Sequence, residues 1–167
     1  MIVLRIVHIL AGVFWVGAFL FTFFLLQPSV AELGPDGGKV MTHLVQRKRM
    51  PIVIMIAALL TIVAGVLLYW RVSDGFNPDW ITSAPGLTFT VGALAAIAAL
   101  AVGFTASKPA GNRMGALGQE IATSGGPPSE AQMAEMQSLG QRLKTVGWVN
   151  LVLLTIAVVA MAAARYL

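Results

Sequence analysis

Two ionisable residues stand in an otherwise apolar N-terminus: Arg5 and His8 lie in the stretch LRIVHILAG, residues 4–12. A spacing of three places both on one face of a helix, and Gly12 and Trp15 continue that face. An ionisable group within a membrane span is costly and usually faces the bundle interior or a cavity. The pair is therefore a candidate functional site.

The chemistry that best suits this face is haem ligation. A neutral imidazole ligates haem iron, methionine is a known second axial ligand, and Met161 is the candidate for that second position. Gly12 could admit the flat macrocycle beside the ring of Trp15. Three arginines predicted at the same end could neutralise the haem propionates: Arg5, Arg71 and Arg165. The pattern predicts a haem b site on His8, near the outer face of a membrane.

Other interpretations of the same residues stay open. In the structural one, His8 hydrogen-bonds a neighbouring helix and the arginines anchor the helix ends at the interface. A quinone or a metal other than haem iron could also use this site. His43 is expected at the opposite end of the molecule, because about 27 Å of helix separate His8 from Leu26. A bis-histidine haem within one chain is therefore disfavoured.

The composition indicates the class of element that positions these residues. The 167-residue chain is 57% hydrophobic and 11% charged, with a mean hydropathy of +0.83. Soluble domains carry about 25% charged residues, so the sequence predicts a membrane protein. Four long stretches lack a charged side chain and can each supply the roughly 20 apolar residues of a spanning helix. We expect an all-α, four-helix membrane bundle in a single domain.

The distribution of basic residues predicts the orientation. Eight of the eleven lie in the two longer connections, at Lys39, Arg47, Lys48, Arg49, Lys108, Arg113, Arg142 and Lys144. The positive-inside rule then places both connections in the cytoplasm and both termini outside. Because this placement explains the net charge of +4, we expect contact with the lipid bilayer and no binding of nucleic acid. His43, Arg47, Lys48 and Arg49 are interpreted as a lipid-headgroup face.

Proline and glycine positions set the expected boundaries of the elements. The spanning helices are predicted at about 2–27, 50–71, 85–107 and 145–166, and the stretch ending at Arg49 could extend the second helix. The connection 108–144 is expected to be a cytoplasmic loop with an amphipathic helix capped by Ser129. Small residues recur at helical spacing, which predicts close packing: Ala57, Thr61 and Gly65, then Gly92, Ala96, Ala99 and Gly103. Asn150 is expected to hydrogen-bond across helices.

The remaining residue types restrict the chemistry further. All seven carboxylates fall outside the apolar stretches and cysteine is absent, so neither an intramembrane carboxylate relay nor a thiolate site is expected. Eight methionines, among them the pair Met133 and Met136, raise copper(I) handling as an alternative, since thioethers suit that ion. No pair of methionines has a spacing that would build a ladder within a span.

The stretches RIVHILAGVFWVGAFLF and RKRMPIVIMIAALLTIVAGVLLYW resemble the opening hairpin of the copper-resistance protein D and HemJ-type group of small bacterial four-helix membrane proteins. The resemblance rests on His8, on Trp15 with Gly17, and on Arg49 before Met50 and Pro51. The ending MAAARYL is similar to relatives of unknown function. The resemblance implies that His8 ligates haem b. The third apolar stretch lacks the polar and histidine positions of the HemJ-type enzymes, so their oxidase activity is not implied.

These observations predict a multi-pass protein of the bacterial cytoplasmic membrane that serves electron transfer or haem handling, without group-transfer catalysis. The alternative from another class is a structural accessory subunit of a larger respiratory or photosynthetic complex. In that case the small-residue stripe faces a partner and His8 packs. A homo-oligomer is a further expectation.

Overall fold

The computed structural model describes the backbone of residues 1–167 and every side chain except that of Pro35. Within this description the chain is helical, with short turns and no strand. The elements in chain order are α1 (Ile2–Phe21), η1 (Thr22–Leu26), α2 (Gln27–Glu32), α3 (Gly34–Thr42), η2 (His43–Arg47), α4 (Met50–Val72), α5 (Pro78–Ile81), α6 (Ala84–Val102), η3 (Gly103–Ser107), α7 (Lys108–Ser124), α8 (Glu130–Ala163) and η4 (Ala164–Tyr166).

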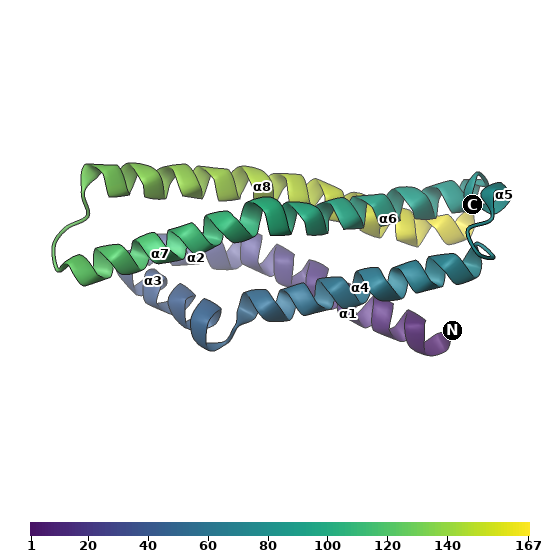
Figure 1. Cartoon of the computed structure of the whole chain (residues 1–167), viewed down its shortest axis with the longest axis horizontal. Coiled ribbons are helices and arrows are strands. Elements are labelled where there is room, and N and C mark those ends of the chain that lie inside the picture. The colour runs from purple at the N-terminus through teal and green to yellow at the C-terminus, as the bar shows by residue number, and fades with distance from the viewer.

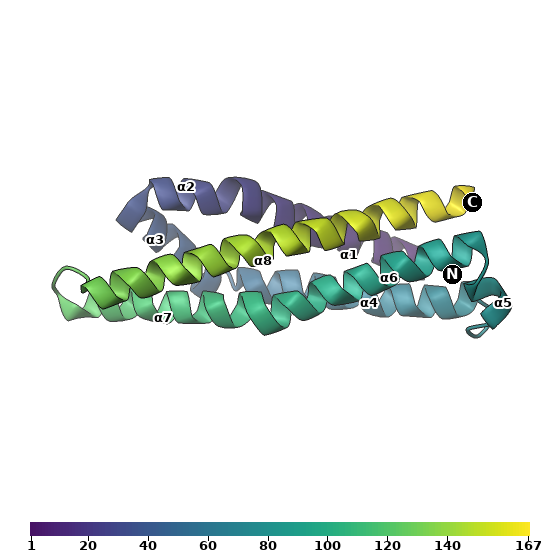
Figure 2. The same ribbon diagram turned by 90° about the horizontal axis from the view of Figure 1, so that it is seen from above.

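Four helical rods are long and apolar enough to cross a membrane: Ile2–Glu32, Met50–Val72, Ala84–Ser124 and Glu130–Tyr166. This confirms the predicted all-α membrane bundle with four spans. Both termini lie at one end, next to α5 (Figure 1; Figure 2). We call this the terminal end, and the opposite end, with α3 and the α7–α8 turn, the loop end. Which end faces the cytoplasm stays a prediction.

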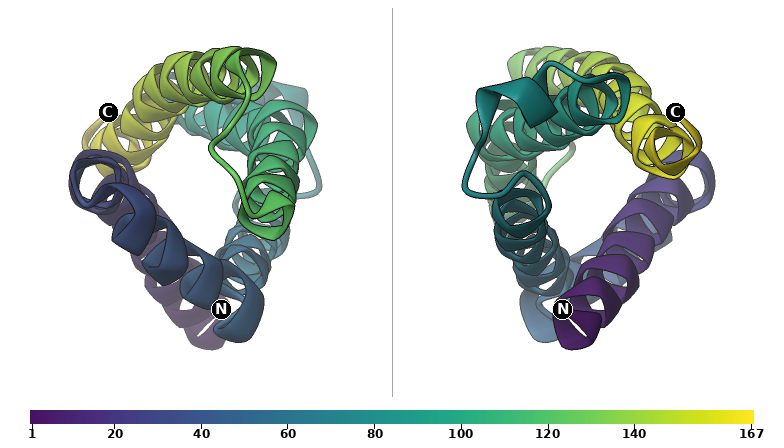
Figure 3. Two further views of the ribbon diagram at one scale, coloured as in Figure 1. Left: turned by 90° about the vertical axis from the view of Figure 1, so that its left-hand side faces the viewer. Right: turned by 90° about the vertical axis from the view of Figure 1, so that its right-hand side faces the viewer.

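The bundle consists of two helical hairpins. α1 packs along α4, and α6 packs along α8. Viewed along the long axis, the rods follow one another around a ring in the order α1, α4, α6 with α7, and α8 (Figure 3). The buried residues of α4 and α6 are small: Ala57, Ala58, Thr61 and Ala64, then Gly86, Gly92, Ala95 and Ala99. Four members of the predicted stripes are among them, whereas Gly65 and Ala96 are half-buried. Gly103 begins η3 and has no neighbouring helix within 4 Å of its Cβ position, so its predicted packing role is wrong. Small side chains let membrane helices approach closely enough for van der Waals contact.

Trp15 is the one large residue at the middle of this ring. It is 7% exposed and belongs to a core cluster drawn from all four rods, with Ala57 and Ala58 of α4, Ala99 of α6 and Leu154 of α8. An indole presents a large contact area, and the small partners on α4 and α6 leave room for it beside Leu154. The two hairpins therefore share one core at the level of Trp15.

Aromatic contacts join the hairpins on both sides of this core. At the loop end, the ring of Phe23 occupies the space beside Gly147 of α8 and meets Trp148 edge-on at 5.3 Å. At the terminal end, the hydroxyl of Tyr69 lies 2.6 Å from Oγ1 of Thr90. Thr90 itself donates to a backbone oxygen of α6, so the tyrosine is the donor and α4 is tied to α6.

Two rods run beyond the ends expected from the sequence. The first helix continues through Pro28 to Glu32, and the third continues through Pro109 to Ser124. In each case a π-helical turn ends two residues before the proline, as η1 and η3. Proline removes a backbone donor and crowds the carbonyl four residues earlier, and a widened turn relieves that crowding. Pro28 and Pro109 therefore lie within continuous helical rods and do not end them.

The segment between α3 and α4 also differs from the expected extension of the second helix. The helix breaks at Lys48 and Arg49, and Arg49 has a left-handed backbone, with φ of +51°. A left-handed residue cannot continue a right-handed helix. By contrast, the predicted cap is confirmed: Ser129 and Gln132 form a reciprocal capping box at the start of α8.

The shared core makes Trp15 the residue whose truncation should cost most. We expect Trp15→Ala to lower the melting temperature of the detergent-solubilised protein clearly, because comparable truncations in soluble cores cost about 3–5 kcal/mol. Phe14→Ala is the matched control, since Phe14 is the next residue along and 49% exposed. Equal melting temperatures for the two variants would contradict a core built around Trp15.

Candidate functional site

The imidazole of His8 lies half-buried between α1 and α4. Its Nδ1 is 2.8 Å from the backbone oxygen of Thr61. A carbonyl oxygen only accepts hydrogen bonds, so Nδ1 carries the proton and donates. In the neutral ring the lone pair of Nε2 is then free. The contact that the structural interpretation expects is also the contact that prepares a histidine ligand, because metal-bound imidazoles commonly donate their second N–H to a carbonyl.

Gly65 makes the space that His8 occupies. A Cβ atom built on Gly65 would lie 2.9 Å from Cε1 and 3.1 Å from Nδ1 of the imidazole. One turn deeper, a Cβ on Gly12 would lie 3.4 Å from Cγ2 of Thr61. A methyl group there would make ordinary van der Waals contact, so Gly12 lies against α4 but the approach of the two helices does not require a glycine at this position. The small stripe on α4 has two uses, since it packs against α1 and it holds one edge of the ring.

The other nitrogen of the ring has no recorded partner. Nε2 of His8 makes no hydrogen bond to the described residues, and His8 as a whole is half-buried. Nε2 is therefore the candidate ligand atom of this side chain.

Met161 lies at about the depth of His8, on the other hairpin. His8, Gly65, Gly92 and Met161 are each seven residues from a member of the Trp15 cluster, toward the terminal end, which is about 10 Å of helix. The terminal Cε of Met161 lies 3.2 Å from the position of a Cβ on Gly92. Met161 therefore packs against α6, while His8 packs against α4, and the described contacts do not join the two side chains.

The three candidate arginines lie at the terminal end in different settings. Arg71 lines a pocket of about 230 Å³ with Trp70 and Leu67 of α4 and with Met1 and Leu4 of α1. Leu4 is one helical turn from His8, but His8 itself is not among the residues that line this pocket. The guanidinium of Arg165 lies 5.2 Å from the ring centre of Tyr166. Arg5 is exposed.

The donor atoms at this site fit a haem. The volume of the nearby pocket determines how much of a bound macrocycle the protein could enclose. An unprotonated imidazole nitrogen suits the iron, and the Arg71 guanidinium suits a propionate. A pocket of about 230 Å³ is smaller than the 300–1,000 Å³ of enclosed ligand sites. A macrocycle would thus be partly exposed to lipid. The described residues contain no group of three or more histidine and carboxylate side chains that could hold a metal ion, so the site relies on one imidazole.

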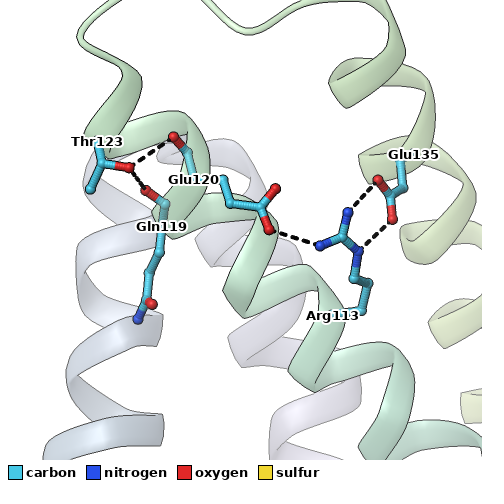
Figure 4. A network of polar contacts seen from close by, with 5 residues as sticks. All are labelled: Arg113, Gln119, Glu120, Thr123 and Glu135. Carbon is cyan, nitrogen blue, oxygen red and sulfur yellow. Dashed lines mark hydrogen bonds and ion pairs between the residues drawn. The ribbon is translucent and has the colours of Figure 1, made fainter.

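A charged network at the loop end was not foreseen from the sequence. Arg113 of α7 donates through Nε and Nη2 to both carboxylate oxygens of Glu135 on α8, at 2.6 and 2.8 Å, and through Nη1 to Glu120 at 2.9 Å (Figure 4). These hydrogen bonds raise the pKa of Arg113 and lower that of Glu135. The spacing of seven residues between Arg113 and Glu120 places both on one helix face and could have indicated their contact. Glu135 lies on α8, beyond the turn that follows α7, so no local spacing indicates its contact with Arg113. Beneath the network, Ala110 and Leu117 are buried.

Asn150 differs from its expected role. It is 8% exposed, but its Oδ1 atom has no partner among the described residues. Asn150 therefore does not make the hydrogen bond across helices that the sequence suggested.

Fold and site together define an all-α, multi-pass membrane protein, built from two antiparallel hairpins around one tryptophan, with a hydrogen-bonded histidine near the terminal end. No family model, curated protein or solved structure matches the chain. The copper-resistance D and HemJ-type resemblance therefore stays an expectation.

The fit between His8 and Gly65 predicts strong coupling between them. Gly65→Ala should destabilise the protein, because the new methyl group would displace the imidazole and break its hydrogen bond to Thr61. In a His8→Ala background the same change should be neutral or stabilising, since the space is then vacant. Thermal unfolding of the four proteins in a double-mutant cycle measures the coupling.

Gly17→Ala is the control for the glycine substitution, because a Cβ there meets nothing within 4 Å. Additive effects of Gly65→Ala and His8→Ala would mean that the imidazole does not occupy the described position.

The charged network predicts a pH dependence for the α7–α8 hairpin. Because the pKa of Glu135 is lowered, its contribution is present above the ordinary glutamate pKa of about 4.3 and is lost as the pH falls further. Amide exchange of α7, corrected for its intrinsic pH dependence, should accelerate there. The effect should be modest, because the groups are partly exposed. Glu135→Gln should flatten the pH profile and Glu32→Gln, in the other hairpin, should not; equal profiles would contradict the role of this pair.

Proposed function

We propose that the protein binds one haem b between α1 and α4 at the terminal end, with Nε2 of His8 as an axial ligand. The bound haem would serve electron transfer or haem handling in a bacterial cytoplasmic membrane. When bound, haem supplies a one-electron redox couple. The four-span bundle supplies the apolar setting, and the chain's own residues supply ligation and charge.

The observation that carries this proposal is the hydrogen bond from Nδ1 of His8 to the Thr61 carbonyl at 2.8 Å. It fixes the tautomer and the orientation of the ring. Gly65 supports the same orientation from one side of the ring. The second nitrogen, Nε2, makes no recorded hydrogen bond and is the atom proposed to ligate the iron.

The surrounding residues would act on the anionic side of the ligand. Arg71 lines a pocket together with Leu4, which is one helical turn from His8, and Arg5 is exposed three residues before His8 on α1. Both can donate to propionate carboxylates at the membrane surface. Met161 lies at a similar depth but packs on Gly92, so second-site ligation would require its side chain to turn from α6. Trp15 is committed to the core, about 10 Å deeper.

The proposal is tested by the absorption spectrum of protein purified from cells supplied with a haem precursor. We expect a Soret band that His8→Ala abolishes and His43→Ala retains. His43 is the matched control because it is the other histidine of the chain and lies in η2, at the loop end. Met161→Leu should shift the band without removing it, provided that this thioether ligates the iron.

Two results would contradict the proposal. A band that survives in His8→Ala would place the ligand elsewhere. A colourless protein that co-purifies with a large membrane complex would instead favour the accessory-subunit function. Thermal unfolding of His8→Ala, measured in parallel, separates loss of the ligand from loss of the fold.

A further inference from the structure

A groove opens between α1 and α4 on the loop side of their crossing. In the view of Figure 1 the two helices cross and diverge toward the loop end. The space between them is about 260 Å³ and is lined mainly by apolar side chains, among them Phe14, Ala18 and Phe21 of the first rod and Val53 and Ile54 of α4. It lies on the same hairpin as His8, at the opposite end.

The occupant of this groove must be apolar over most of its length. The groove walls belong to the spanning rods, and their rims are exposed: Phe14 is 49%, Phe21 55% and Val53 46% accessible. At that depth the surrounding medium is hydrocarbon, which leaves no water to fill a hollow. A lipid acyl chain meets this requirement, and the volume is right for a segment of one.

The mouth of the groove is positively charged. Lys48 is part of the lining, and Arg47 and Arg49 are its neighbours in the chain. All three are exposed, and the described chain records no ion pair for any of them, whereas the nearby Lys39 is paired with Asp36 at 2.8 Å. Unpaired cations at the edge of a membrane groove are complementary to a phosphate group.

The backbone at the mouth adds to this charge. α4 begins at Met50, which also lines the groove. Its N-cap, Arg49, makes no side-chain cap hydrogen bond and adopts the left-handed conformation that ends η2 before the groove. The positive end of the α4 dipole is therefore uncapped by a side chain at the place where the basic residues gather.

We propose that this groove binds one anionic phospholipid of the leaflet at the loop end. Its acyl chain lies between α1 and α4, and its phosphate is bound by Lys48 with Arg47 and Arg49. The bilayer itself is the source of the ligand, so the site is filled from the side rather than from solution. The site depends on neither His8 nor haem.

Native mass spectrometry of the full-length protein in detergent tests this proposal, with phosphatidylglycerol and phosphatidylcholine of identical chains as probes. The first lipid should bind with one preferred site and about tenfold or more tighter than the second, as expected for several cations near one headgroup. In Arg47→Gln/Lys48→Gln/Arg49→Gln that preference should disappear. The control Lys108→Gln/Arg142→Gln/Lys144→Gln removes the same charge from the other hairpin and should keep it.

A second pair of variants tests the apolar part. Ala18→Phe fills the groove and should weaken both lipids, while Gly17→Phe, at a neighbouring position with nothing within 4 Å of its Cβ site, should weaken neither. Soluble glycerol phosphate should not displace phosphatidylglycerol. Equal binding of the two lipids, an unchanged preference in the first triple variant, or binding of glycerol phosphate as tight as that of the lipid would each overturn the proposal. Should Ala18→Phe fail to fold, the charge variants decide.

Discussion

The packing of Trp15 in one core with alanines of α4 and α6 and a leucine of α8 is the constraint on which the rest of the structure depends. Lipid tails are as apolar as leucine, so burying apolar surface between membrane helices gains little, and close van der Waals contact must hold the bundle together. One indole among Ala57, Ala58, Ala99 and Leu154 provides that contact for both hairpins at once. It also fixes where α1 and α4 cross. The crossing divides their interface into a terminal half with His8 and a loop half with the groove.

Away from the Trp15 core, glycines also allow a large side chain of one helix to pack closely against the next. Gly65, Gly92 and Gly147 each leave a space on one helix that a side chain of the neighbouring helix fills: His8, Met161 and Phe23. A side chain inserted into such a space sets the register of two helices more tightly than a uniform surface of leucines could. The orientation of the His8 ring is therefore a consequence of helix packing. If His8 binds a ligand, it uses a ring orientation that helix packing already fixes.

Residue pattern was enough to predict the four spans, the use of small residues for packing on α4 and α6, and the cap at Ser129, because each follows from local spacing. It placed Gly103 in the packing stripe wrongly, because spacing alone does not show where a neighbouring helix ends its contact. It could not predict how the chain passes Pro28 and Pro109, since the widened turns before them depend on the helix continuing to pack. The Arg113–Glu135 pair joins positions on either side of a turn, so its geometry exists only after the hairpin has formed. The hydrogen-bond partner of His8 could not be predicted from the sequence either. A backbone carbonyl is present at every residue, and only the register of α1 against α4 selects that of Thr61.

The two hairpins differ in what they leave unfilled. Between α6 and α8, buried alanines and glycines bring the helices together. Toward the loop end, α7 continues the line of α6, and its contact with α8 is completed by the buried Leu117 and the Arg113 network. Between α1 and α4, contact extends from His8 against Gly65 to the core at Trp15. Each side of this contact holds a hollow lined by a cationic residue, Arg71 at the terminal end and Lys48 at the loop end. Both hollows lie on the first hairpin, so a ligand in either would contact α1 and α4 together.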